Sequence, residues 1–358
     1  MSGHEHFPPP GAPFGEPTTP PPPPPGWAPP PPPATYAAGR PWTPPVAMLG
    51  AAHRPGVIPL RPLGLGDIYD AAFRIIRVNP QATVGVAVLV AAITMAVPVL
   101  VTAVLTFTLG VTVDEASQGV GDAVGSWSTV LSVLLLQVSL VFVTACVAHV
   151  TSQAAIGRRT TLGATWAATR GRRWRLIGLS LLVLVAFVVV FVGYVVAWVL
   201  VVALTDGVVL PLLFGVVSFP AFVFLMGWLW IRVLYLPAPV LVLEQVGLFR
   251  AIGRGYRLTS RQSARTLGIA LLTLLITAVA SQLLAVPFSV AGLLLSEVVD
   301  PAHAALVLVV TQALATVVSS AFAAPFSAAV VALQYVDLRM RKEGYDVELM
   351  SRAGVLGP

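Results

Sequence analysis

The stretch Leu176–Leu204, LIGLSLLVLVAFVVVFVGYVVAWVLVVAL, decides the fold class, because it contains no Asp, Glu, Lys or Arg. A helix of about 20 apolar residues crosses the hydrocarbon core of a bilayer, so this stretch predicts a transmembrane helix. The chain contains further runs of this kind, and together they are 82–109, 129–155, 176–204, 209–243, 267–295 and 304–336. We therefore predict an all-α integral membrane protein with six transmembrane helices.

The composition of the whole chain agrees with this prediction. Of its 358 residues, 57% are hydrophobic and 10% are charged, and the mean hydropathy is +0.87. An ordinary soluble domain carries about 25% charged residues. The composition therefore excludes a soluble globular enzyme and a nucleic-acid binder, although the isoelectric point is near 10.0.

The loops between the runs differ in charge, and this difference sets the predicted orientation. The loops after the first, third and fifth runs contain acidic residues, among them Asp114, Asp206 and Asp300, and no Lys or Arg. The other side holds nearly all of the Arg residues and Lys342. Because cytoplasmic loops accumulate Lys and Arg, we expect both termini in the cytoplasm and a multi-pass protein of the bacterial inner (plasma) membrane.

Residues 1–56 form a separate, proline-rich segment that includes the runs Pro20–Pro25 and Pro29–Pro33. Proline lacks a backbone donor and fixes φ, so we predict a disordered cytoplasmic tail with polyproline II character. This tail is either a solvated extension or the ligand of a protein partner that recognises proline-rich sequence. The six-span membrane domain then occupies residues 57–348, and residues 349–358 form a cytoplasmic C-terminal tail.

An Arg-bearing, partly amphipathic stretch precedes each pair of runs. In the first, DIYDAAFRIIRV at 67–78, the isoleucine, tyrosine and phenylalanine side chains share one side of a helix, opposite Arg74 and Arg77. Comparable stretches lie at 162–175 and 248–261. Helices of this kind lie in the membrane interface, and cationic residues there attract anionic lipid. We therefore predict three units, each an interfacial elbow helix followed by a helical hairpin, with Arg74 and Arg77 at anionic lipid.

The third amphipathic stretch carries the best-defined group of charges. Its apolar residues lie on one side of a helix, and the opposite side is a stripe formed by Arg250, Arg254, Arg257 and Arg261. This stripe either holds the helix on the anionic head groups of the inner leaflet or binds a phosphorylated ligand or an acidic partner. Both interpretations rest on the match between guanidinium and phosphate groups.

Polar side chains within the apolar runs are candidates for a functional site, because ionisable groups are costly in a membrane. They are Arg232, His149, Gln137, Gln282 and Gln312 within the runs, and Glu244 directly after the fourth run. Arg232 lies far enough beyond Val209 to reach the inner interface. His149 has no second His or carboxylate at ligand spacing, so we predict no metal site and no cofactor.

The fourth run, 209–243, is too long for one straight crossing and contains four prolines. A helix rises by about 1.5 Å per residue, and the hydrocarbon core is about 30 Å thick. We expect either a kinked helix or one broken near Pro237.

The sequence contains none of the common catalytic motifs, since GxSxG, the P-loop, HExxH and CxxC are all absent. The acids on the predicted inner side, among them Glu244, Asp337 and Glu343, lie within several residues of Arg or Lys, which is typical of solvated interface charges. We therefore expect no catalytic residues.

Three segments resemble one known bacterial family. They are IPLRPLGLGDIYDAAFRIIRVNPQATVG at 58–85, RVLYLPAPVLVLEQVGLFRAIGRGYRLTSR at 232–261 and YVDLRMRKEGYDVEL at 335–349. The family is the membrane domain that accompanies some glycerophosphoryl diester phosphodiesterases, and the chain is similar to stand-alone, actinobacterial-type members with a proline-rich N-terminus. The resemblance implies that hydrolysis belongs to a separate soluble barrel. This chain lacks such a barrel, so no catalytic residue carries over.

We interpret the chain as a non-catalytic membrane module that serves as a scaffold, an anchor or a lipid-linked accessory. The alternative is a transporter or channel for small molecules or lipids, which the internal repeat and the polar residues within spans favour. An intramembrane lipid-modifying enzyme is a third interpretation. A continuous polar path through the protein would favour transport, whereas a closed core packed with Ala and Val would favour the module.

Overall fold

The computed structural model describes residues 56–59, 61–104, 107, 120–205 and 207–352. The predicted proline-rich tail lies outside these residues, apart from Gly56. Within the described residues every regular element is a helix, and six helices are long and apolar enough to cross a membrane. The prediction of an all-α protein with six spanning helices is confirmed.

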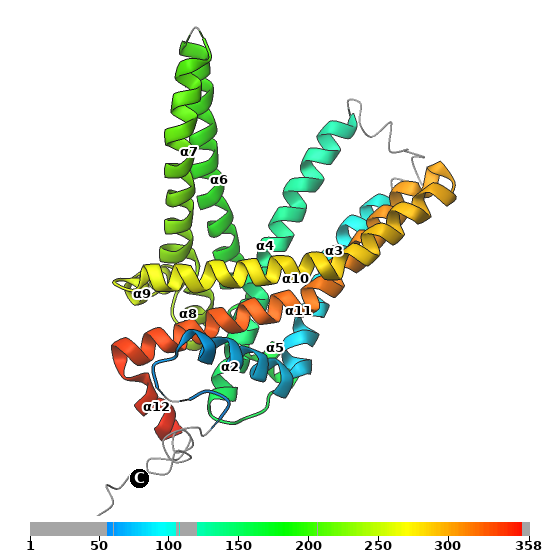
Figure 1. Ribbon diagram of the computed structural model, residues 1–358. Helices are drawn as coiled ribbons and strands as arrows, with labels where there is room; N and C mark the ends of the chain where they lie inside the picture. The colour runs from blue at the N-terminus through cyan, green and yellow to red at the C-terminus, as the bar shows by residue number, and fades with distance from the viewer. Residues whose placement is uncertain (1–55, 60, 105–106, 108–119, 206, 353–358) are drawn as a thin grey trace, which may run out of the picture. The chain divides into compact units, whose positions relative to one another are not determined.

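The helices repeat one arrangement three times along the chain (Figure 1). The short helices that open the three units are α2 (Leu65–Val78), α5 (Leu162–Ala168) and α9 (Leu248–Thr259). The long pairs that follow them are α3 (Pro80–Val104) with α4 (Val120–Ala155), α6 (Arg173–Leu204) with α7 (Val209–Leu229), and α10 (Ser263–Val298) with α11 (Pro301–Glu343). The predicted unit of an elbow helix and a hairpin is therefore confirmed.

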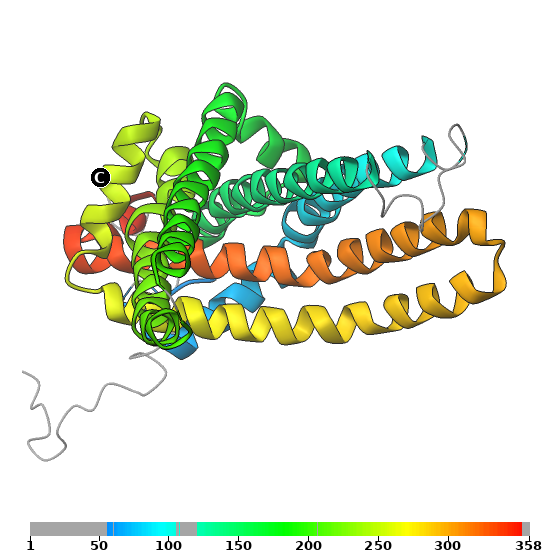
Figure 2. The ribbon, with the colours of Figure 1, turned by 90° about the horizontal axis from the view of Figure 1, so that it is seen from above.

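Helix α11 packs against α2, α3, α4 and α10, and Figures 1 and 2 show it running beside α10. A Cβ atom at Gly292 of α10 would come within 2.3 Å of the Thr311 Oγ1 atom of α11, so glycine allows this close approach. The core around α4 and α11 is rich in Ala and Val, for example Ala145, Val147 and Ala329. Small side chains let helices approach closely, and close packing drives helix association in lipid.

The α6–α7 hairpin is held together by its own aromatic side chains. Tyr194 stacks on Phe222 with 4.2 Å between ring centroids, and Trp198 meets Phe214 edge-on at 5.6 Å. The buried residues of α6 lie between Leu176 and Val183, and α7 has none. The rest of the hairpin exposes apolar side chains, a surface suited to lipid and not to water.

Span four is broken. A π-helical turn (η2, Trp230–Leu234) follows α7, and a short helix α8 (Pro237–Leu243) comes next. Pro237 has no backbone N–H and stands at the first position of α8, where a proline suits the start of a new helix after the break. The side chains from Pro237 to Val242 are all buried, and α8 packs against α4, α6, α9 and α11. Of the two predicted forms of this span, the broken one is correct.

Several other elements also differ from their predicted bounds. Helix α9 ends at Thr259, and Arg261 has a φ of +66°, so Arg261 lies in the turn before α10 and off the helical stripe. The stretch at 162–175 divides into α5 and the start of α6. The first residues of the predicted C-terminal tail, 349–352, belong to helix α12 (Tyr345–Arg352), which packs against α11 and buries Tyr345 and Leu349.

Candidate functional site

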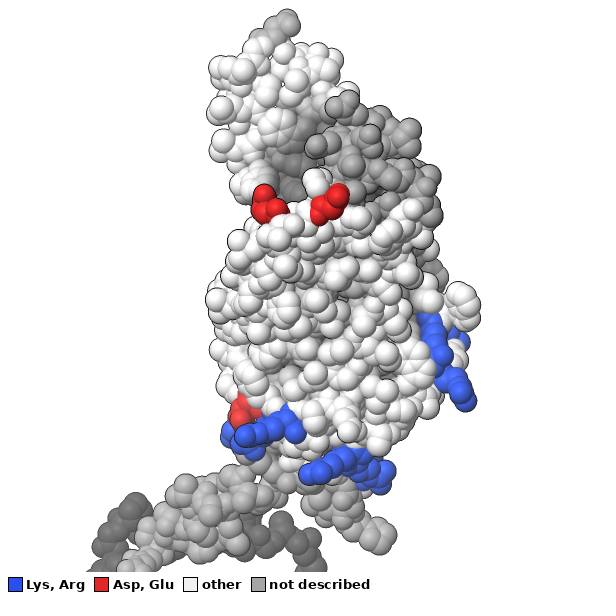
Figure 3. Space-filling view, turned by 90° about the vertical axis from the view of Figure 1, so that its right-hand side faces the viewer, with Lys and Arg blue, Asp and Glu red and all other residues white. Residues whose placement is uncertain are grey.

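Charged side chains are separated along the spans. Figure 3 shows a broad uncharged band between acidic side chains at one end and basic side chains toward the other. The basic side contains two groups of paired charges. The Glu244 cluster consists of Glu244, Arg254, Tyr335, Arg339, Glu343 and Glu348, and the Asp337 cluster consists of Leu63, Arg265, Asp337 and Arg341.

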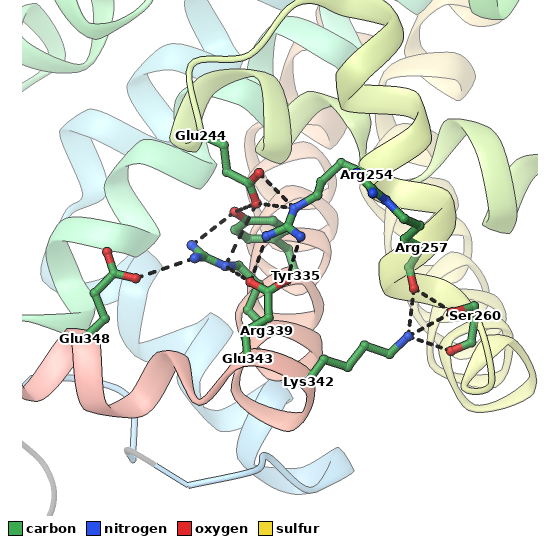
Figure 4. A network of polar contacts seen from close by, with 9 residues as sticks. All are labelled: Glu244, Arg254, Arg257, Ser260, Tyr335, Arg339, Lys342, Glu343 and Glu348. Carbon is green, nitrogen blue, oxygen red and sulfur yellow. Dashed lines mark hydrogen bonds and ion pairs between the residues drawn. The ribbon is translucent and has the colours of Figure 1, made fainter.

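Arg254 of α9 is the centre of the Glu244 cluster (Figure 4). Its Nε donates to both carboxylate oxygens of Glu244, the C-cap of α8, at 2.9 and 3.1 Å. Its terminal nitrogens lie 2.7 Å from the carboxylate oxygens of Glu343 near the end of α11. One guanidinium thus bridges two carboxylates from different helices, a strong and directional contact.

Arg339 of α11 completes the cluster on its other side. Its Nε donates to Glu343 at 3.0 Å, and its Nη2 reaches Glu348 of α12 at 3.5 Å. The guanidinium also lies 3.9 Å from the centre of the Tyr345 ring, a cation–π contact. The Tyr335 hydroxyl donates to Glu244 at 2.8 Å, so α11 contacts Glu244 directly as well.

The Glu244 cluster contains two arginines and three carboxylates, and Arg352 outside it contacts Glu348. With Arg352 included, three arginines and three carboxylates alternate and their charges balance. Partial burial alone would lower the pKa of Arg254, but its hydrogen bonds to Glu244 and Glu343 and their charges raise that pKa above its ordinary value. Arg254 therefore stays charged at physiological pH, and the cluster ties α8, α9, α11 and α12 together.

The Asp337 cluster fixes the chain before α2. Asp337 is 1% exposed, and its carboxylate accepts hydrogen bonds from the Leu63 backbone N–H at 2.7 Å, from Arg265 at 2.5 Å and from Arg341 at 2.9 Å. Both arginines also donate to the Leu63 carbonyl oxygen, at 2.6 and 3.0 Å. The buried carboxylate is fully engaged, as a buried charge must be. The segment before α2 is thereby held to α10 and α11.

The four arginines of the predicted stripe differ in their surroundings. Arg254 turns toward the protein, whereas Arg250, Arg257 and Arg261 are exposed, and within the described residues their side chains have no hydrogen-bond or ion-pair partner. Lys342 donates to the backbone carbonyls of Arg257 and Ser260, at 2.7 Å each, and so caps the end of α9.

The other predicted polar candidates do not lie together at one site. Arg232 lies over the Tyr256 ring, 5.1 Å from its centre, and His149 and Gln137 are half-buried on α4. Gln282 and Gln312 are exposed on α10 and α11. In the part of the chain that the structure describes, no three His, Cys, Asp or Glu side chains group as metal ligands. Arg74 and Arg77 are exposed on α2.

The sequence interpretation of the inner acids was wrong for Glu244 and Asp337. They were expected to be solvated interface charges, but the Glu244 side chain is 16% exposed and that of Asp337 is 2% exposed. Their partners Arg265, Tyr335 and Arg339 were not singled out. The ion pair between Asp337 and Arg341 could have been predicted, because these residues are four positions apart on one helix.

No protein-family model, curated protein or solved structure matches this chain. The structure does bring together the three segments that stand out in the sequence. Leu63 of the first contacts Asp337 of the third, and Arg254 of the second contacts Glu343 of the third. These segments therefore meet in two separate polar clusters, and both clusters include residues of α11.

Replacing Asp337 by Asn should lower the free energy of unfolding of the full chain by about 2–3 kcal/mol. Removing one partner of a buried ion pair costs about 3–5 kcal/mol, and the partial exposure of Arg265 and Arg341 reduces this cost. The control is Asp70→Asn, because Asp70 and Arg74 form an exposed pair whose loss should cost under about 1 kcal/mol. Thermal unfolding in detergent compares the two variants, and equal effects would contradict a structural role for Asp337.

Proposed function

We propose that this chain is a non-catalytic integral membrane module of the bacterial inner membrane, serving as a scaffold, an anchor or a lipid-linked accessory. The observation that carries the proposal is the packing among α3, α4 and α11, where the described core is rich in Ala and Val. Most of its buried threonines donate a hydrogen bond to a carbonyl of their own helix, as Thr144 does to Leu140 at 2.7 Å. Such hydroxyls are already satisfied and offer little to a passing solute.

The distribution of intramembrane amides supports the same proposal. Gln334 is buried, and its amide donates to the Tyr235 hydroxyl at 3.0 Å, which links α11 to the break in span four. Gln282 and Gln312 lie on exposed faces. An amide that bonds another helix, or faces outward, stabilises packing without lining a channel.

We propose the orientation in the membrane from the distribution of basic and acidic residues. The Glu244 and Asp337 clusters and the exposed arginines of α9 all lie on the side where the loops are basic, whereas Glu297 and Asp300 lie on the opposite side. Because basic residues are retained in the cytoplasm, both termini are proposed to be cytoplasmic.

Membership of the phosphodiesterase-associated membrane-domain family is also a proposal. It is supported by the segments 58–85, 232–261 and 335–349, which contact one another through the two clusters. The non-catalytic role follows from the same segments. Their acids Glu244, Glu343 and Asp337 are all engaged by arginines, which supports a structural use of these carboxylates.

A transporter is the second candidate, and the break in span four favours it. Discontinuous helices form the binding sites of many transporters. Arg232 lies in the π-helical turn at this break, and its Nε is buried without a hydrogen-bond partner. The two candidates differ in whether water reaches the core.

The orientation predicts which introduced cysteines react with a membrane-impermeant maleimide. In a Cys146→Ser background, Gly207→Cys should react on intact cells, because it lies in the loop between α6 and α7 on the predicted outer side. Ser351→Cys in α12 should react only after the cells are opened. Reaction at position 351 but not at 207 would invert the proposed topology.

Water access to the core is tested by the native thiol. Cys146 is 0% exposed and lies among the buried residues of α4. A module with a dry core predicts that a small water-soluble thiosulfonate leaves Cys146 unmodified in membranes exposed on both sides, while Gly207→Cys reacts fully in parallel. Mass spectrometry of the intact chain measures both. Modification of Cys146 on the same timescale as position 207 would favour the transporter.

A further inference from the structure

A groove of about 750 Å³ opens between α2, α3, α10 and α11. Its lining is almost entirely apolar and includes Phe73 and Ile76 of α2, Val84 of α3, Leu284 of α10 and Phe322 of α11. Arg77 is the one charged residue among the lining side chains described by the structure. The groove thus combines an apolar floor with a single cation.

Arg77 is placed at the level of the membrane interface. It lies in the last turn of α2, three residues before Pro80 opens the spanning helix α3. Its side chain is exposed, and within the described residues it has no hydrogen-bond or ion-pair partner. Arg74, one turn earlier on the same helix, is instead paired with Asp70 at 3.0 Å. Of these two arginines, only Arg77 is available to an external anion.

The chemistry of the groove matches a lipid better than a soluble anion. Its apolar side chains suit an acyl chain, and a free guanidinium at the interface suits a phosphate group, which it can bind through a fork of N–H donors. Moving an acyl chain from lipid to an apolar groove changes its free energy little, because both surroundings are apolar. Selectivity among lipids must therefore come from the head group at Arg77, as in other basic pockets between spans.

We propose that this groove holds one anionic phospholipid, with an acyl chain along α3 and α11 and its phosphate on Arg77. The inference rests on the membrane placement within the proposed function, but it does not depend on the non-catalytic role. It assigns to α2 a site for an individual lipid, distinct from the general attraction of exposed arginines to an anionic surface.

The test is native mass spectrometry of the purified full chain with added phosphatidylglycerol or phosphatidylcholine of identical acyl chains. The wild-type chain should bind the first phosphatidylglycerol at least about fivefold more tightly than phosphatidylcholine. Arg77→Gln should remove this preference. The matched control Arg74→Gln should keep it, because Arg74 lies outside the groove and is paired with Asp70.

A second variant tests the apolar part of the groove. Val318 of α11 lines the groove and is 36% exposed, so Val318→Trp should fill the groove without disturbing the core. It should weaken tight binding of the first molecule of both lipids by a similar factor. Added inorganic phosphate should not displace phosphatidylglycerol.

If the Arg77→Gln and Arg74→Gln variants lose the preference for phosphatidylglycerol to the same extent, the proposal is overturned in favour of non-specific surface attraction. Displacement by phosphate would overturn it in favour of a soluble anion, and unchanged binding in Val318→Trp would exclude the groove. A wild-type chain that passes the cysteine topology test yet shows no lipid preference would reject the lipid site and leave the membrane module standing.

Discussion

The bridge from Glu244 through Arg254 to Glu343 is the interaction on which the basic side of this protein depends. Span four breaks at Pro237, and the short helix α8 that follows is buried among four other helices. Glu244 ends α8 and its side chain is only 16% exposed, so its carboxylate needs hydrogen-bond partners within the protein. Arg254 supplies them, and it joins the broken span to α11, the helix around which α2, α3, α4 and α10 pack.

Most of the fold could be predicted from the sequence because the bilayer imposes it. In lipid, an apolar run such as 176–204 must form a helix that satisfies its own backbone hydrogen bonds. At 67–78, the helical spacing of apolar and charged residues predicts an interfacial helix. The end of α9 was less predictable, because Arg261 continues the helical spacing in sequence but adopts φ +66° in the turn. The packed face of α9 was also missed. Ala251, Gly255 and Leu258 are buried, whereas Phe249 is 78% exposed.

The candidate site was harder to predict, since its contacts join residues far apart in the chain. Arg254 and Glu343 are separated by 89 positions, and Leu63 and Asp337 by 274. Helical spacing indicates which side chains share a face, but not which face meets another helix. Hence Arg254 was grouped with three arginines that are exposed. Paired charges thus hold the helices together, whereas Arg77 and Arg257 are exposed and have no hydrogen-bond or ion-pair partner among the described residues.

A double-mutant cycle on Glu244 and Arg254 tests most directly whether this bridge holds α8, α9 and α11 together. The free energy of unfolding in detergent would be measured for Glu244→Gln, Arg254→Gln, the double variant and the wild-type chain. Partly buried, hydrogen-bonded partners should show a favourable coupling of about 1–3 kcal/mol. The exposed pair Asp70 and Arg74 should show about 0.3–0.5 kcal/mol. A Glu244–Arg254 coupling no larger than that of the exposed pair would contradict the central role of the bridge.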